Sequence, residues 1–517
     1  MLASSVSMAE AVQLCVIFVV LAVLYRSITL QRRRYQRKVF AQSHGCEEPV
    51  EVQQESLMGI HMLWESFQGL RHNSYLSLTK QRFQRYGNTF RFHQLLAPRI
   101  LTIDQQNVKE VLMRVDDFGV GKQRAEAFEP LIGHGIFTAD GDEAARLRKL
   151  VKPCFAWGRS DNLSMFESHV QNLIARLPKN EREPIDLAPL FAALTMDVST
   201  EFLFDESTSV LSSQSAASAG TKFSEAFDRG QKGVIKAFAL GWLANLLPGM
   251  RAREEQGIVR DFMNQYVERA RSLRDSKMGQ QEPDKKSEYS FLEAISQQMD
   301  DPELIRGALL NLLLAGRDTT ASLLSNLFFV LARRPKIYQT LAREIMSITP
   351  DPSQPPTLAN LKAAKYLRAC IDESLRLHAP IPRNSRTALR DTTLPRGGGP
   401  DGTEPIFVAE GTEVGYQVFS LHRRKDIFGE DAGYFVPERW TERDMRTEWA
   451  FLPFNNGKRI CIGQQLARNL ASYTVFRLVQ KFARVQSFDD SEWEEGLGIT
   501  CSTKNGAWVT LRQRETR

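Results

Sequence analysis

The sequence predicts a mainly α-helical protein with a small β region, preceded by a single N-terminal transmembrane helix. Three observations predict this fold class. Apolar residues recur at helical spacing over much of residues 105–380, and short strand-like runs stand at residues 88–104 and again after Pro395. A mostly apolar stretch at residues 8–25 lies ahead of both. We therefore expect one helical body with a small sheet region, attached to a membrane anchor.

The N-terminal stretch has the composition of a membrane anchor. It is apolar except for Glu10 and Gln13, and its length is close to the roughly 20 residues that a spanning helix needs. Basic residues follow it and none precedes it, which is the reverse of a secretory signal and places the C-terminal side in the cytoplasm. A removed signal or a buried helix is the alternative. The basic residues are Arg26, Arg32, Arg33, Arg34, Arg37 and Lys38.

The rest of the chain shows no internal repeat and predicts a single catalytic domain. Residues 61–87 are expected to form a helix that ends at Gly87, because glycine commonly terminates helices. Two polar stretches, residues 207–220 and 276–290, are expected to be surface loops. The predicted parts are an anchor at residues 1–30, a basic linker at residues 31–54 and the catalytic domain at residues 55–517.

The composition is that of a globular protein with a large core. The 517 residues are 42% hydrophobic and 25% charged. The net charge is +6, and basic residues cluster near residue 30, which indicates a membrane surface; we find no nucleic-acid-binding signature and expect no nucleic-acid partner. The six cysteines are scattered without paired spacing, which argues against a disulfide framework and a zinc site. Their distribution indicates a cytosolic environment.

One cysteine stands in a segment with an unusual pattern. In FNNGKRICIG, Cys461 has no second cysteine or histidine near it. A lone thiolate can bind a metal if a cofactor supplies the other ligands, as a haem does with four nitrogens. Gly457 and Gly463 would let the backbone turn tightly and approach a porphyrin. Arg459 could pair with a haem propionate, and Phe454 could cover the sulfur. A buried structural cysteine in a turn is the alternative.

The pattern F-x-x-G-x-R-x-C-x-G resembles the haem-ligand loop of the cytochrome P450 superfamily, and every fixed position is present. The resemblance runs from about residue 55 to the end of the chain. It implies the cytochrome P450 fold, a haem-thiolate monooxygenase activity and Cys461 as the axial iron ligand. It also implies haem b held non-covalently, because Ala315 stands where some animal relatives carry a glutamate that is ester-linked to haem.

The segment LLLAGRDTTASLL resembles the oxygen-binding helix of that superfamily. The resemblance implies that Gly316 lets the helix open and that Asp318 and Thr319 deliver protons during oxygen activation. A polar pair within an apolar helix is costly unless it is partnered, although a solvent-facing position is the alternative. A haem-thiolate isomerase or dehydratase, which is a second candidate function, could dispense with the pair. A haem sensor or electron carrier is a third.

Three further charged residues match a known structural set. Glu373 and Arg376 are three residues apart and therefore share one helix face. Arg439 follows in the segment VPERW. Such a pair alone is usually a surface ion pair, but the order and spacing of the three residues resemble the buried triad that holds the haem loop in the superfamily.

Two arginines match positions that bind haem propionates in the superfamily. They are Arg148 and Arg386, and ordinary surface charges are the alternative. Most members carry a tryptophan where this chain has Ala144, so one propionate hydrogen bond is missing or replaced, for which Arg146 is a candidate.

The segments HGCEEP, FQGLRHNSYL, HRRKDIFGEDAGYF and LPRGGGPDG resemble fungal enzymes that hydroxylate alkanes and fatty acids. The resemblance implies a long-chain aliphatic substrate, with tailoring oxidation of a polyketide or other secondary metabolite as the alternative. It also implies an endoplasmic reticulum location, a cytosolic catalytic domain, and membrane lipid and NADPH-cytochrome P450 reductase as partners. The substrate would come from the membrane side near residues 234–250, and Arg383 could bind its polar end or point away. The expected pocket residues are Ala315, Ala379, Ile381 and Asn384.

Overall fold

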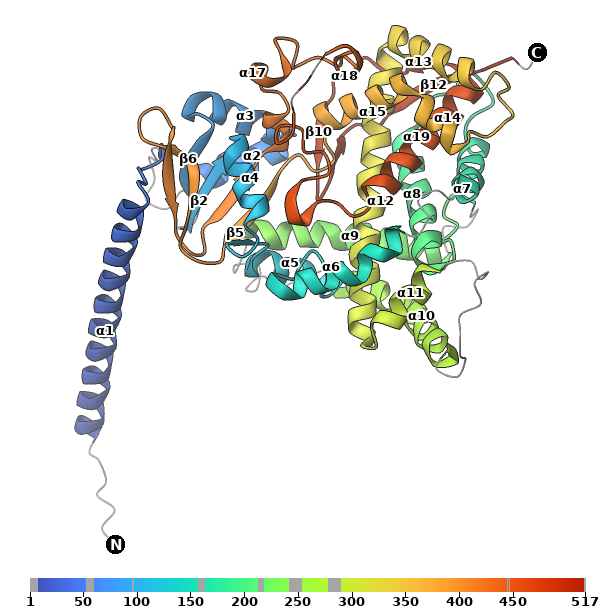
Figure 1. Ribbon diagram of the computed structural model, residues 1–517. Coiled ribbons are helices and arrows are strands. Elements are labelled where there is room, and N and C mark those ends of the chain that lie inside the picture. Colours follow the sequence, from blue (N-terminus) through green and yellow to red (C-terminus); the bar gives the residue numbers. More distant parts are fainter. Residues whose placement is uncertain are drawn as a thin grey trace.

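The computed structural model confirms a mainly helical protein with small sheets and a long N-terminal helix that stands away from the domain (Figure 1). The structure describes residues 8–52, 60–94, 97–156, 163–212, 218–240, 253–277, 290–443, 445 and 447–515. The segment expected to meet the membrane, residues 234–250, lies outside this described part from residue 241 onward.

Helix α1, Met8–Ser43, continues through the basic stretch instead of ending near residue 30. The sequence explains this continuity, because no glycine or proline interrupts the helix before Gly45, whose φ is 63°. Its part Gln13–Ser43 is long and apolar enough to cross a membrane, and the most apolar 18 residues of it are not buried by the domain. Helix α8, Leu187–Phe204, passes the same test but is mostly buried inside the domain.

The C-terminal half of α1 is fastened to the domain by ion pairs. Arg37 donates from Nε and Nη2 to the two carboxylate oxygens of Asp391, at 2.9 and 2.8 Å. Arg33 pairs with Glu410. Asp391 and Glu410 flank the hairpin of β6, Thr392–Gly398, and β7, Glu404–Val408. Two arginines one helical turn apart thus set the direction in which α1 leaves the domain.

The helix expected over residues 61–87 is divided in two, and that prediction is wrong at its middle. Helix α2 covers Ile60–Arg71 and α3 covers Tyr75–Tyr86. Asn73 between them has a φ of 51°, a left-handed conformation that asparagine tolerates better than most residues. The predicted end of the helix is confirmed, since Gly87 is the C-cap of α3 with a φ of 87°.

Helix α3 begins without a cap of its own, because the Ser74 side chain makes no capping hydrogen bond. The buried carboxylate of Glu495 replaces it, and both of its oxygens accept from the amide of Leu76, at 3.0 and 2.9 Å. Glu495 opens β10, Glu495–Leu497, which pairs with β11, Cys501–Thr503. This carboxylate therefore fastens the hairpin to the positive end of a distant helix.

The strands form a mixed five-stranded sheet and three smaller sheets. The largest has the order β1-β2-β8-β5-β3; β2 and β8 run parallel and the other neighbours antiparallel. Its strands are β1, Thr89–Gln94; β2, Ala97–Thr102; β3, Phe118–Gly119; β5, Asn384–Ala388; and β8, Glu413–Tyr416. A three-stranded sheet joins β4, Ile185–Asp186; β12, Trp508–Gln513; and β9, Phe482–Ser487.

Helix α12, Pro302–Arg333, is the centre of the helical part. Asp301 caps it by accepting from the amide of Glu303, and its first residue is a proline, which suits that position. It packs against α8, against α15, Lys365–Leu377, and against α19, Gln464–Lys481. Most of its residues are buried, the apolar ones in the larger of the hydrophobic clusters, and a second cluster lies at the five-stranded sheet.

The remaining helices surround this centre or connect the strands (Figure 1). They are α4, Gln105–Met113; α5, Lys122–Ile132; α6, Gly141–Ala156; α7, Leu163–Ala175; α9, Ala219–Leu240; α10, Arg253–Lys277; α11, Phe291–Gln298; α13, Pro335–Ile348; α14, Leu358–Ala363; α16, Val418–Leu421; α17, Lys425–Phe428; and α18, Arg439–Glu442.

Replacing Glu495 with glutamine tests its ionisation at the end of α3. Burial raises the pKa of Glu495 from 4.5 to about 7, against the opposing effects of the α3 amides and Arg383. Between pH 4.5 and 7 the folded protein keeps a proton that the unfolded chain loses, so the free energy of unfolding falls as pH rises. We expect Glu495→Gln to reduce that fall by about 1–3 kcal/mol in denaturant titrations at several pH values. Glu494→Gln, at the exposed neighbour, should not; equal slopes in both variants would refute the assignment.

Candidate functional site

The loop that carries Cys461 is a tight turn closed by backbone hydrogen bonds. The amide of Cys461 donates to the carbonyl of Phe454 at 3.0 Å, across a short 3-10 helix at Gly457–Arg459. Gly457 has a φ of 72°, and a Cβ there would lie 2.6 Å from the carbonyl oxygen of Leu112. Both observations require glycine. Gly463 has a φ of −83°, which any residue can adopt, so its expected turn-forming role is not needed in this geometry.

Cys461 is exposed, although neighbouring protein atoms partly desolvate its thiol. This desolvation raises the pKa of the thiol, while the amide of Gly463 and the charge of Arg148 favour the thiolate. Arg148, on α6, donates to the carbonyl of Ile460, next to the cysteine. Arg148, which is predicted to bind a haem propionate, therefore also stabilises the cysteine loop. The Phe454 ring lies 5.0 Å from the guanidinium of Arg468 on α19.

A short stretch in the middle of α12 is less buried than the residues on either side of it. Ala315, Gly316, Asp318 and Thr319 are half-buried, whereas most residues on either side of them are fully buried. Thr319 donates from its hydroxyl to the carbonyl of Ala315 at 2.7 Å. This stretch is therefore less tightly covered by protein than the residues on either side of it in α12.

The Asp318 carboxylate is incompletely compensated. One of its oxygens lies 3.2 Å from Arg317 Nη1, and the other is buried without a hydrogen-bond partner among the described residues. Burial raises the pKa of Asp318; Arg317 opposes that rise and the charge of Asp228 adds to it. The group is thus closer to protonation near neutral pH than an ordinary aspartate.

Arg124, Arg148, Arg386 and Arg459 gather where a dianionic group could bind. Arg386 donates to the Ser385 carbonyl at 2.7 Å, and Arg124 donates to the Asn384 side chain at 3.1 Å. Arg459 contacts Asp140 at 3.2 Å. Burial, followed by the charges of Arg386 and Arg459, lowers the pKa of Arg124 to about 10.

In this arginine cluster the positive charges outnumber the negative ones. The positive charges of Arg386 and Arg459 lower the pKa of Arg124, whereas the negative charge of Asp140 raises it. The buried Nε of Arg124 has no hydrogen-bond partner among the described residues. Together with the thiol of Cys461, this excess of positive charge fits a haem, whose two propionates would meet the arginines.

Sequence reasoning missed Arg124. It lies in KQRAEAFEPLI, a polar helix in which an arginine is expected to face solvent, so no local signal marks it. The replacement proposed for the absent tryptophan is not supported, because Arg146 is half-exposed and pairs with Glu143 at 3.8 Å. Ala144 itself is buried.

The residues expected to line the substrate pocket differ in their burial and in the direction of their side chains. Ala379 is buried, and Ala315 and Ile381 are half-buried. Asn384 has its side-chain oxygen engaged by Arg124 and Arg386, so it faces the arginine cluster. Arg383 is exposed and points away toward α3; it donates to the Tyr75 hydroxyl at 3.0 Å and lies 4.8 Å from that ring.

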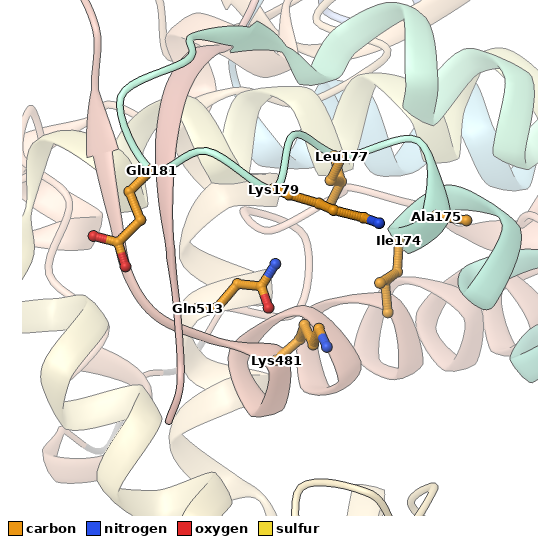
Figure 2. A pocket seen from close by; sticks show the side chains of 7 residues that line it. All are labelled: Ile174, Ala175, Leu177, Lys179, Glu181, Lys481 and Gln513. Atoms are coloured by element: carbon orange, nitrogen blue, oxygen red, sulfur yellow. The ribbon is translucent and has the colours of Figure 1, made fainter. Parts of the chain in front are cut away.

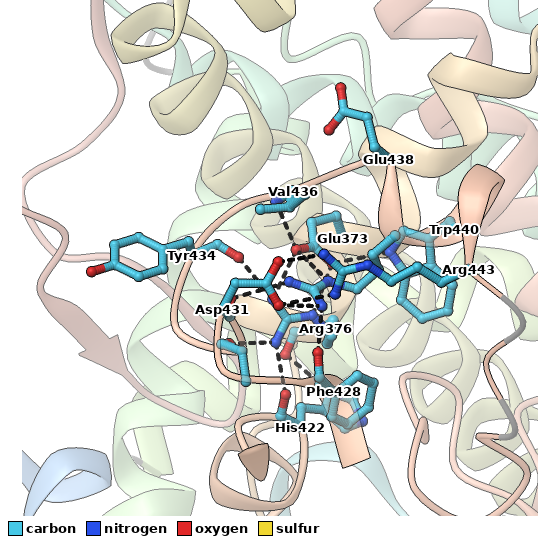
Figure 3. Close-up of polar contacts among 12 residues, drawn as sticks. Glu373, Arg376, His422, Phe428, Asp431, Tyr434, Val436, Glu438, Trp440 and Arg443 are labelled. Carbon is cyan, nitrogen blue, oxygen red and sulfur yellow. Dashed lines mark hydrogen bonds and ion pairs between the residues drawn. The ribbon is translucent and has the colours of Figure 1, made fainter. Parts of the chain in front are cut away.

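The charged triad is assembled at the centre of a buried network (Figure 3). Arg376 makes two 2.8 Å bonds to the two oxygens of Glu373, and Arg439 Nε lies 3.1 Å from one of them. Trp440 Nε1 and the amide of Val436 also donate to this carboxylate, at 3.0 and 2.8 Å. The three triad side chains are fully buried. The sequence alone predicted their order but not these neutral donors.

His422 connects the triad to the cysteine loop. Arg376 donates to the His422 carbonyl at 2.8 Å, and the ring Nδ1 of His422 lies 3.0 Å from the Arg376 carbonyl. The other ring nitrogen accepts from the amide of Leu452 at 2.8 Å, two residues before Phe454. Burial lowers the pKa of His422 to about 3, so the ring is neutral and can donate on one side while accepting on the other.

A separate groove of about 530 Å³ lies at the far end of α19 (Figure 2). Lys481, the last residue of that helix, lines it, whereas the cysteine loop precedes the first residue, Gln464. An 18-residue helix is about 27 Å long, so the groove is distant from the loop. Its lining is Ile174, Ala175, Leu177, Lys179, Glu181, Lys481 and Gln513.

Comparison with known proteins agrees with this geometry. The family model for Cytochrome P450 matches residues 56–506, which include the cysteine loop, the polar stretch of α12 and the triad. The chain is 37% identical to the cytochrome P450 monooxygenase himC of Aspergillus japonicus, over 96% of this chain and 88% of that protein. It is 37% identical to cytochrome P450 52A12 of Debaryomyces hansenii, over 86% and 88% of the two chains. For cytochrome P450 52A1 of Candida tropicalis the identity is 39%, over 80% and 78%.

Removing the charge of Glu373 should destabilise the domain strongly. Glu373→Gln keeps the shape of the side chain but removes the carboxylate that the fully buried Arg376 and Arg439 share, which leaves Arg439 with its ion pair to Asp431. We expect a loss of about 3–5 kcal/mol in the free energy of unfolding. Asp431→Asn is the matched control, because Asp431 pairs with Arg439 at the partly exposed edge of the network and should cost about 1 kcal/mol or less. Equal losses in denaturant unfolding would contradict this ranking.

Neutralising Arg124 should weaken haem retention. A charge-assisted hydrogen bond contributes roughly 1.5–3 kcal/mol, so Arg124→Gln should speed haem transfer to an excess of apomyoglobin by roughly 10- to 100-fold. Arg146→Gln, at the half-exposed arginine outside the cluster, should leave the transfer rate unchanged. An unchanged rate in Arg124→Gln would show that this arginine does not contact the haem.

Proposed function

Because the chain belongs to the cytochrome P450 family and is a monooxygenase, we propose that it hydroxylates a hydrophobic, long-chain aliphatic substrate, an alkane or a fatty acid. One atom of O₂ enters the substrate as a hydroxyl group and the other leaves as water. Two protons and two electrons complete the balance, and NADPH-cytochrome P450 reductase supplies the electrons. The proposal for the substrate rests on the resemblance of several segments to fungal alkane and fatty-acid hydroxylases.

The proposed cofactor is haem b, held without a covalent ester. Cys461 would be the axial ligand, and the observation that supports it is the closed loop in which the Gly463 amide and Arg148 favour the thiolate. When bound, the haem iron supplies the activation of O₂. Arg148, Arg386 and Arg459, together with Arg124, would hold the propionates. Position 315 is alanine and offers no carboxylate for a covalent link.

The proposed catalytic residues are Asp318 and Thr319. Burial raises the pKa of Asp318, so this carboxyl takes up a proton more readily than an ordinary aspartate and can act as a proton donor. The Thr319 hydroxyl, which donates to the Ala315 carbonyl, can orient a proton or a water molecule beside the reacting oxygen. Ala315, Ala379 and Ile381 would form the apolar wall that directs the substrate chain. Asn384 is assigned to the propionate side instead, because its side-chain oxygen is engaged by two arginines.

The proposed location is the endoplasmic reticulum membrane, with one spanning segment and a cytosolic catalytic domain. Helix α1 supplies the apolar span, and its basic residues lie on the C-terminal side. Loops rich in arginine and lysine stay on the cytoplasmic side of membranes. A substrate dissolved in lipid would then be concentrated next to the domain.

The test is a binding and turnover assay with dodecane, lauric acid and palmitic acid. In the haem-loaded, full-length protein we expect at least one to give a type I spectral shift and, with reductase and NADPH, an alcohol product. Cys461→Ala should lose the red-shifted Soret band of the reduced CO complex, whereas Cys370→Ala, at a buried cysteine outside the loop, should keep it. If no chain substrate binds while the parent keeps that band, tailoring of a polyketide becomes the better account.

A further inference from the structure

A polar seam joins α9 to α12 next to the proposed proton-transfer residues. Arg317 of α12 binds Asp228 of α9 through both terminal nitrogens, with Nη2 at 3.0 Å from Oδ2 and Nη1 on the other oxygen. The same Nη2 donates to Ser224 at 3.2 Å, one turn earlier on α9. The two helices are labelled in Figure 1, and α9 crosses α12 there. This contact lies one residue before Asp318.

Arg317 is a buried cation that two carboxylates share. Its side chain is 4% exposed, so it needs compensation from within the protein. Asp228 provides a two-point contact from a side chain that is 49% exposed. Asp318 lies 3.2 Å from Nη1 of Arg317 through one oxygen, and its other oxygen is buried without a hydrogen-bond partner among the described residues. The guanidinium is thus oriented toward α9 and away from full pairing with its neighbour in sequence.

This division of charge determines how easily Asp318 takes up a proton. A guanidinium that is fully paired to a carboxylate stabilises its ionised form. Burial raises the pKa of Asp318, Arg317 lowers it, the negative charge of Asp228 raises it again, and the Gln231 side chain on α9 lowers it. On the α8 side, the uncharged hydroxyl of Ser199 lies beside Gly316, two residues before Asp318. Asp228 therefore favours the protonated form of Asp318 in two ways. Its negative charge repels the Asp318 carboxylate, and it binds the Arg317 guanidinium that would otherwise pair with that carboxylate.

We propose that Asp228 is a positioning residue that holds Arg317 on α9 and so leaves the Asp318 carboxyl free to take up and release a proton. The inference rests on the proposed function of Asp318 and extends it to a second helix. Asp228 does not relay the proton itself, because the guanidinium between the two carboxylates does not deprotonate in proteins. Placement of α9 against α12 is thereby coupled to proton supply, and the coupling is reciprocal.

The test is Asp228→Asn in the haem-loaded, full-length protein. Infrared spectra across a pH series, with those of Asp318→Asn subtracted, isolate the protonated Asp318 carboxyl without any need for turnover. We expect the proton affinity of Asp318 to fall about tenfold or more in Asp228→Asn, because Arg317 then pairs with Asp318. Asp228→Glu should restore most of it. In parallel, peroxide formed per NADPH should rise in Asp228→Asn.

Glu225→Gln is the matched control. Glu225 lies on the same helix, three residues before Asp228, is 59% exposed and pairs with Arg229 at 3.5 Å. It should change neither the infrared titration nor the peroxide yield. An unchanged Asp318 titration in Asp228→Asn overturns the inference. If the titration shifts but Asp318→Asn couples NADPH to product as well as the parent, the proposed proton role of Asp318 fails instead.

Discussion

The functional side of the domain depends on one buried carboxylate between two buried cations. Glu373 lies on α15, while Arg439 and Trp440 come from the short helix α18 and Val436 from the irregular chain just before it. A buried ion pair contributes little net stability compared with apolar packing, but it is strongly directional. Its value here is geometric. Through Arg376 and His422 it fixes the amide of Leu452, and hence the start of the cysteine loop, relative to a helix of the core.

The buried charges around the site are of two kinds, those whose charge is fully compensated by partners and those whose charge is not. In the network of Glu373, each buried charge has several partners, so the geometry of the network is rigid. In the arginine cluster and at Asp318, compensation is incomplete, because one buried atom each of Arg124 and Asp318 finds no hydrogen-bond partner within the part of the chain that the structure describes. Incomplete compensation costs stability, and it is found where a group must bind a ligand or exchange a proton.

Sequence alone predicted the features that short segments encode. The cysteine loop, the polar stretch of α12 and the end of α3 at Gly87 each carry a local pattern, so their existence could be inferred. Arg124 and His422 could not, because their importance depends on partners far away in the chain, such as Asn384 and Leu452. The division of α2 from α3 depends on a single left-handed residue, Asn73, within an otherwise helical pattern. Asn384 was placed in the pocket because a sequence cannot show which way a side chain turns.

Helix α1 gives the protein an arm of fixed length. Its 36 residues span about 54 Å, and a bilayer interior accounts for about 30 Å of that. In the proposed arrangement about 24 Å of uninterrupted helix extends above the hydrocarbon. Arg37 clamps this end to Asp391, so the joint does not act as a free hinge. A bilayer that thins or thickens changes the tilt of such a helix. In this arrangement the orientation of the whole domain relative to the membrane surface changes with that tilt.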